Sequence, residues 1–223
     1  MSLKMLESKK EYVQNFINSY MKWYKEHNFR ELDIMNEDLV MYFIKYKSYT
    51  DMQVRTLRKI ITGSNAHIDS ESKDVVLNWL KDEFVKYLKT GQNTDFDGWH
   101  KEICTNFQDK FNNEVLKGKY KPIQFGKAQK IVNMTIKYLS TCDNAYEYEQ
   151  LFTNCHMVLD SFILRWYYTE VSTDTKKSLQ KIWSNLSYDE YLEIQNKIRV
   201  YFLNKEQLPF DEEWEIWEQW KNK

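Results

Sequence analysis

Glycine and proline are scarce in this chain, which has 5 glycines and 2 prolines among 223 residues. A protein built from many short strands needs frequent tight turns, and these two residue types supply most of them. The glycines stand at positions 63, 91, 98, 118 and 126, so no two are closer than seven residues. That spacing excludes the glycine-rich loops of dinucleotide-binding and P-loop enzymes.

Cysteine and histidine are also rare. The three cysteines, Cys104, Cys142 and Cys155, cannot all pair within one chain, which favours a reducing compartment. No basic segment followed by an apolar segment opens the chain, and no uncharged stretch reaches the roughly 18 residues that a membrane span requires. We therefore expect a cytoplasmic protein that does not contact membranes.

The four histidines are at least 33 residues apart, so the chain has no H-E-x-x-H zinc motif. It also has no G-x-S-x-G sequence, the turn that presents the nucleophile of α/β-hydrolases. The common hydrolase signatures are therefore absent. We expect no cofactor and no bound metal.

Large apolar side chains are abundant. Hydrophobic residues make up 42% of the chain, with 8 Trp, 16 Tyr and 12 Phe, which is enough for a packed interior and argues against disorder. The length suits one domain spanning 1–223. The 27 Lys against 5 Arg, with 17 Asn and 3 Ala, indicate the AT-rich genome that many bacteria have.

Hydrophobic residues recur at helical spacing along most of the chain. In the first segment Phe16 and Ile17 lie three and four residues after Val13, Tyr20 lies four and three residues after them, and Tyr24 lies four residues further on. The expected helices cover 4–27, 36–47, 51–62, 71–90, 98–117, 124–141, 145–154, 156–169, 187–204 and 210–221. This pattern predicts an all-α, single globular domain of about nine or ten helices.

The segment 156–169 is apolar on all sides of a helical wheel, which predicts a buried helix near the centre of the fold. It nevertheless carries His156, Asp160 and Arg165, and buried polar groups need partners. His156 and Asp160 are four residues apart, so on a helix the carboxylate could orient the imidazole as a general base. The alternative is that His156 caps the helix while Asp160 and Arg165 satisfy neighbouring groups.

Charge is unevenly distributed. Residues 101–142 carry 8 Lys and 3 acidic residues, whereas the chain from Glu206 onward carries 6 acidic residues and 2 Lys. In the basic segment Lys127, Lys130 and Lys137 share one side of the helix expected over 124–141. Together with the free N–H groups of a helix start near Gly126, they form a candidate anion-binding site. Either a solvated helix face or basic and acidic segments that face each other would explain the same charges.

Two fragments suggest metal binding. The six residues Asn93–Gly98 resemble the first half of an EF-hand calcium loop, but His100 and Cys104 stand at its eighth and twelfth positions, where an aliphatic residue and a glutamate are needed. Asp95 or Asp97 as a helix N-cap explains that fragment better. His100, Cys104, Cys142, Cys155 and His156 could in principle bind zinc, but free cysteines are commonly buried small hydrophobic residues.

Near the C-terminus, Trp214, Trp217 and Trp220 recur every three residues on an expected helix that begins with Pro209 and acidic residues. Docking onto the protein's own core is the simpler interpretation. The alternative is a surface for a protein partner, since Trp is enriched at interface hot spots.

These observations predict a noncatalytic binding or adaptor protein. Its partner would be anionic, with nucleic acid as one possibility, or another protein. The alternative hypothesis is an enzyme acting on a phosphate-bearing small molecule, in which His156 is the general base, Asp160 orients it and the three lysines hold phosphate.

Overall fold

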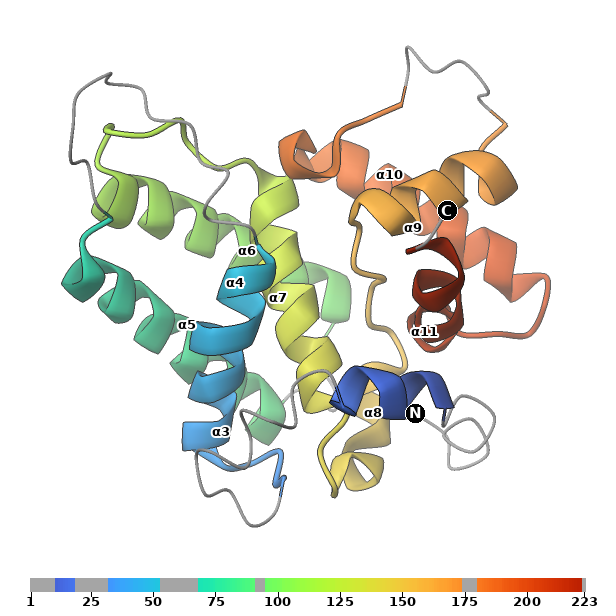
Figure 1. Ribbon diagram of the computed structural model, residues 1–223, viewed down its shortest axis with the longest axis horizontal. Coiled ribbons are helices and arrows are strands. Elements are labelled where there is room, and N and C mark those ends of the chain that lie inside the picture. Colours follow the sequence, from blue (N-terminus) through green and yellow to red (C-terminus); the bar gives the residue numbers. More distant parts are fainter. Residues whose placement is uncertain (1–10, 19–31, 53–67, 91–94, 174–179, 222–223) are drawn as a thin grey trace.

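Helices account for nearly all regular structure in the computed structural model, which describes residues 11–18, 32–52, 68–90, 95–173 and 180–221. No strand occurs in these ranges, and the all-α multi-helix prediction is confirmed (Figure 1). One continuous cluster of buried hydrophobic side chains runs through the described part of the chain. The helix expected over 51–62 and most of the one expected over 4–27 lie outside the described residues.

The first half of the described chain forms a short helix over 11–18 and several longer helical stretches. Its named elements are α3 (Glu37–Tyr42), η1 (Phe43–Ser48), α4 (Tyr49–Asp51), α5 (Ser70–Thr90), α6 (Phe96–Lys110) and η4 (Phe111–Leu116). The Asn36 side chain caps α3 by accepting from two backbone N–H groups, and Asp95 caps α6 by accepting from the N–H of Gly98. Polar side chains that bond free N–H groups are what starts a helix at these positions.

The helix at the centre of the fold is α7 (Phe125–Leu139), all of whose residues are buried. Figure 1 shows it running between α3–α6 on one side and α9–α11 on the other. Elements α6, η1 and α4 pack against it, as do the later η8 and α10. Because neighbours surround α7, its lysines have no solvated face.

The second half of the described chain consists mainly of short elements and two longer helices. They are η5 (Ala145–Tyr148), α8 (Glu149–Phe152), α9 (Ser161–Trp166), η6 (Tyr167–Val171), η8 (Trp183–Asn185), α10 (Tyr188–Leu203) and α11 (Pro209–Trp220). A capping box at Ser187 and Glu190 starts α10. Pro209 and the acidic first turn start α11.

The prediction of a central helix over 156–169 is wrong for its first five residues. Residues 155–160 are not helical, and α9 begins only at Ser161, after the Asp160 N-cap. The buried backbone of this segment bonds to side chains instead: Gln129 donates to the Leu159 carbonyl, and Glu213 accepts from the Val158 N–H. These side chains bond backbone N–H and carbonyl groups that in a helix would bond one another.

Among the described residues, no helix combines the length and the apolar character needed to cross a bilayer.

Candidate functional site

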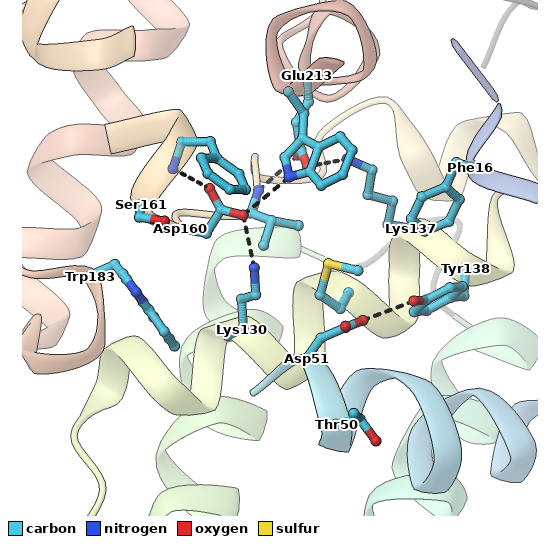
Figure 2. A pocket seen from close by; sticks show the side chains of 14 residues that line it. Phe16, Thr50, Asp51, Lys130, Lys137, Tyr138, Asp160, Ser161, Trp183 and Glu213 are labelled. Atoms are coloured by element: carbon cyan, nitrogen blue, oxygen red, sulfur yellow. Dashed lines mark hydrogen bonds and ion pairs between the residues drawn. The ribbon is translucent and has the colours of Figure 1, made fainter. Parts of the chain in front are cut away.

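A cavity of about 370 Å³ lies where α4, α7, α9, α11 and η8 approach one another. Figure 2 shows the Lys130 side chain pointing from α7 toward Asp160, with Trp183 on one side and Asp51 on the other. We call this cavity the Lys130 pocket. Five charged side chains line it: Asp51, Lys130, Lys137, Asp160 and Glu213.

Lys130 and Asp160 form a buried ion pair at the centre of the pocket. The Lys130 Nζ lies 3.0 Å from Asp160 Oδ2, and each side chain is 9% exposed. The other carboxylate oxygen accepts from the N–H groups of Phe162 and Ile163, which fixes Asp160 as the N-cap of α9. Burial alone would raise the pKa of Asp160, but the Lys130 charge and these N–H donors outweigh it and lower the pKa below its ordinary value.

A second buried pair joins α7 to α11. The Lys137 Nζ lies 2.5 Å from Glu213 Oε1, with side chains 4% and 1% exposed. The other oxygen of Glu213 accepts from the Val158 N–H at 2.8 Å. The Lys137 ammonium also lies 4.5 Å from the centre of the Trp214 ring, within cation–π range. This pair therefore holds α7, α11 and the extended 155–160 segment together.

Asp51 differs from Asp160 in the direction of its pKa shift. Its Oδ2 accepts a hydrogen bond of 2.8 Å from the Tyr138 hydroxyl. Burial raises the pKa of Asp51, although the charges of Lys130 and Lys137 act in the opposite direction. Asp51 thus takes up a proton at a higher pH than an ordinary aspartate does.

Trp183 of η8 forms one wall of the pocket. Its ring centre lies 5.3 Å from the Lys127 Nζ and 5.7 Å from the Lys130 Nζ. Lys127 donates to the Met52 carbonyl at 3.0 Å, and burial lowers the pKa of Lys127 to about 8. Two cationic groups therefore flank one indole, an arrangement that orients the ring and the lysines together.

The hydrogen-bonding capacity left over in the pocket is mostly donor capacity. A lysine ammonium has three N–H donors. Among the described residues, Lys130 uses one of them on Asp160 and Lys137 uses one on Glu213. Among the carboxylate oxygens of the lining, Asp51 Oδ1 is the one without a hydrogen-bond partner in the part of the chain described. A molecule rich in acceptor atoms would complement this cavity.

The structure corrects the prediction of an exposed lysine ridge. Lys127, Lys130 and Lys137 are all less than 8% exposed. Trp183 of η8 lies against Lys127 and Lys130, and Glu213 of α11 is paired with Lys137. The alternative in which the basic and acidic segments face each other describes the Lys137–Glu213 pair. Helical spacing located these lysines correctly on one helix but could not reveal what covers them.

Gly126 does not offer its N–H to an anion. That group donates to the Leu186 carbonyl at 3.0 Å. A Cβ at position 126 would lie 1.8 Å from the Trp183 carbonyl oxygen, so the glycine permits close backbone contact between α7 and η8. The expected anion site on the Gly126 N–H is therefore wrong, and the residue instead positions the Trp183 wall.

His156 and Asp160 do not share a helix face, and they do not hydrogen-bond each other. His156 lies outside the lining of the Lys130 pocket. Its Nδ1 is 2.8 Å from the Tyr191 hydroxyl and its Nε2 is 2.9 Å from Asp97 Oδ1. Burial lowers the pKa of His156, which favours the neutral imidazole. The geometry expected for a His156–Asp160 general base is thus not present.

The polar groups around His156 form a network across α6, α7 and α10 that is buried except at Asp97 and Arg199, which are partly exposed. Arg199 donates two hydrogen bonds, of 2.6 and 2.7 Å, to the Asp97 carboxylate. Asn133 donates to the Tyr191 hydroxyl at 2.9 Å and lies 2.8 Å from His100 Nε2. Because its members satisfy one another, we assign this network to fold specificity. Asn133 and Tyr191 were not predicted, since nothing in a single sequence marks a buried polar position on a helix.

Arg165 was predicted to be buried, and it is exposed. One of its guanidinium nitrogens donates to the Trp220 carbonyl at 3.3 Å. Of the three C-terminal tryptophans, Trp214 is buried against Phe16, with ring centres 5.0 Å apart, whereas Trp217 and Trp220 are half-buried. Trp217 donates to Asp160 Oδ2 at 3.3 Å. Helix α11 therefore docks on the protein's own core and contributes to the pocket.

No group of three metal-ligating side chains occurs among the described residues. Asn93 and Thr94 of the calcium-like fragment lie outside them, and Asp95 is the N-cap of α6 as predicted. The Cys104 sulfur is 3.6 Å from His100 Nε2. Cys142 and Cys155 are buried elsewhere in the core, and burial raises the pKa of all three thiols.

Comparisons with protein-family models, with curated proteins and with solved structures found no match to this chain.

Proposed function

We propose that this chain is a noncatalytic binding protein that holds a small anionic ligand in the Lys130 pocket. One observation carries the proposal: two buried ammonium groups, those of Lys130 and Lys137, line the same cavity and retain N–H donors that the described residues do not use. A carboxylate or phosphate group supplies the acceptors that these donors need, and charge-assisted hydrogen bonds are among the strongest available.

The size of the cavity favours a small molecule over a nucleic acid. Its volume of about 370 Å³ falls in the range of small-ligand pockets. Nucleic-acid phosphates lie along an extended backbone and are contacted from a protein surface. Lys127, Lys130 and Lys137 are buried, so they do not form such a surface.

The walls of the pocket add selectivity. Trp183 and Trp217 present aromatic surface, while Asp160 and Glu213 hold the two lysines in place. With Asp51, the lining has three carboxylates against two lysines, a formal net charge of −1. An anion therefore binds best when Asp51 is protonated, because one negative charge is then removed from the lining.

Binding rather than catalysis is proposed because His156, the imidazole expected to act as a base, lies outside the pocket lining and is engaged by Tyr191 and Asp97.

Calorimetric titration with sulfate, inorganic phosphate and succinate tests the proposal. The informative variant is Lys130→Met/Asp160→Asn, which removes both charges of the pair while Asn can still cap α9. Lys119→Met is the matched control, since Lys119 is an exposed lysine remote from the pocket lining. We expect saturable binding of at least one anion to the wild-type protein and the control, weakened about tenfold or more in the double variant.

Two results contradict the proposal. One is the absence of saturable binding of all three anions up to about 10 mM, a concentration that corresponds to a binding free energy weaker than about 3 kcal/mol. The other is equal binding by the wild-type protein and a folded double variant.

A further inference from the structure

A second cavity, of about 330 Å³, lies in the groove between α5 and α6. In Figure 1 these two helices lie on the opposite side of α7 from α9 and α11, so this groove is separate from the Lys130 pocket. Its lining combines three aromatic side chains, Trp79, Tyr87 and Trp99, with acidic ones. We call it the aromatic groove.

The aromatic wall is held in a fixed orientation. Trp99 stacks on Tyr87 with ring centres 3.9 Å apart and an interplanar angle of 20°, and the edge of Phe84 supports it at 5.7 Å. The Tyr87 hydroxyl donates to the Leu151 carbonyl at 3.2 Å, which anchors the stack to the core. Trp99 is nevertheless only half-buried, so part of this rigid indole faces the groove.

One ring of this groove, that of Trp79, already lies near a cation of the protein that is outside the groove lining. The Lys110 Nζ lies 5.4 Å from the centre of the Trp79 ring. That distance is within the range at which an ammonium group is attracted to an aromatic face. Trp79 therefore shows the kind of contact that the groove offers to a cationic ligand.

The charges around the aromatic wall are mainly negative. Glu83, Asp95 and Glu102 line the groove, against one lysine, Lys86. Asp95 uses one carboxylate oxygen to cap α6. Within the described part of the chain, Glu83 and Glu102 show no hydrogen bond or ion pair, so their charges remain available to a ligand. Their location beside two tryptophan side chains distinguishes them from a solvated acidic patch.

We propose that the aromatic groove binds a small organic cation with an alkylammonium head, a quaternary ammonium above all. Aromatic faces attract such a head through their quadrupole, and the carboxylates add Coulombic attraction without requiring a hydrogen-bond donor. The inference does not depend on the proposed anion pocket, because the two cavities share no lining residue.

The test is a titration monitored by NMR with choline and with its neutral isostere 3,3-dimethylbutan-1-ol, which has the same shape but no charge. The informative variant is Glu83→Gln/Glu102→Gln, in which both changes are on partly or fully exposed side chains. Glu71→Gln is the matched control: Glu71 is an exposed glutamate on the same helix as Glu83, twelve residues and so about 18 Å away.

We expect saturable choline binding that is at least about tenfold tighter than binding of the neutral isostere. The double variant should lose most of this preference, while Glu71→Gln keeps it. A further titration uses Nα-acetyl-trimethyllysine methylamide. If this compound binds more tightly than choline, the natural ligand is a trimethylated lysine side chain of another protein. If choline binds more tightly, the natural ligand is a free metabolite.

Equal affinity for choline and the neutral isostere would overturn the proposal, because it would show an apolar groove that does not recognise charge. No saturable binding of either quaternary compound up to about 100 mM would overturn it as well, as would unchanged binding in a folded double variant.

Discussion

At the residue scale, the fold depends on charges placed where water cannot reach them. Lys137 and Glu213 are each 4% exposed or less, and together they join α7 to α11. Taking two charges out of water is costly. Removing one partner of such a pair is therefore strongly destabilising, because the other charge is left buried without compensation. The same residues line the Lys130 pocket, which links stability to binding.

Replacing one member of this pair should therefore cost more than replacing both. We expect Lys137→Met to lower the free energy of unfolding by about 3–5 kcal/mol, because Glu213 is left buried without its partner. Lys137→Met/Glu213→Gln should cost less, since Gln can still accept from the Val158 N–H. Urea unfolding measures both, with Lys119→Met as the control. A double variant less stable than Lys137→Met would refute the argument.

Asp51 gives the pocket its expected pH dependence. Burial raises its pKa, so as the pH falls Asp51 is neutralised before carboxylates of ordinary pKa. An anion binds more tightly to the protonated form, and its affinity should therefore fall as the pH rises through that pKa. Sulfate is the suitable probe because its charge is constant over this range. Asp51→Asn should bind sulfate with little pH dependence. If the wild-type affinity instead rises with pH, Asp51 does not control binding.

At the scale of elements, hydrophobic periodicity predicted the long helices well. The patterns over 71–90, 187–204 and 210–221 correspond to α5, α10 and α11 within one residue at each end. The capping box at Ser187 marks the start of α10 and Pro209 marks the start of α11, and both signals are visible in the sequence.

The extended segment before α9 could not be predicted in this way. An apolar run that is buried on every side has no periodicity to separate a helix from an extended chain. What decides its conformation are partners far away in sequence, such as Gln129 and Glu213, which bond its backbone. The same limit applies to Lys130 and Lys137, because an apolar stripe opposite a lysine row looks the same whether or not another helix covers the row.

The contact between α7 and η8 offers a test of one element's placement. We expect Gly126→Ala to destabilise the protein by about 1–3 kcal/mol, since the new Cβ would overlap the Trp183 carbonyl, a backbone atom that cannot swing away. The displacement should also move the Trp183 wall and weaken anion binding in the Lys130 pocket. Chemical unfolding and calorimetry measure the two effects.

Gly98→Ala provides the comparison, because its Cβ would meet the Asp95 side chain, which can rotate. Its effect on anion affinity should be negligible, since position 98 lies outside the pocket lining. A Gly126→Ala protein that binds anions with unchanged affinity would show that Trp183 does not need this close contact.

At the scale of the whole molecule, a net charge of −1 conceals two cavities with opposite preferences. The Lys130 pocket offers unused N–H donors, and the aromatic groove offers carboxylates and ring faces. Helix α7 lies between them and carries Asn133, whose side chain is bonded to Tyr191 in the buried network. That network is largely buried and mutually bonded, so we expect it to act as a rigid partition rather than a link between the sites.

Two independent sites have a thermodynamic consequence. A ligand that binds only the folded state stabilises it by RT ln(1 + [L]/Kd), about 2.7 kcal/mol at a hundredfold excess over Kd. Sulfate and choline together should therefore raise the midpoint of thermal unfolding by the sum of their separate effects, measured against sodium chloride at matched ionic strength. Lys130→Met/Asp160→Asn should lose the sulfate shift alone, and Glu83→Gln/Glu102→Gln the choline shift alone. A combined shift clearly larger or smaller than the sum would show that the partition transmits binding from one cavity to the other.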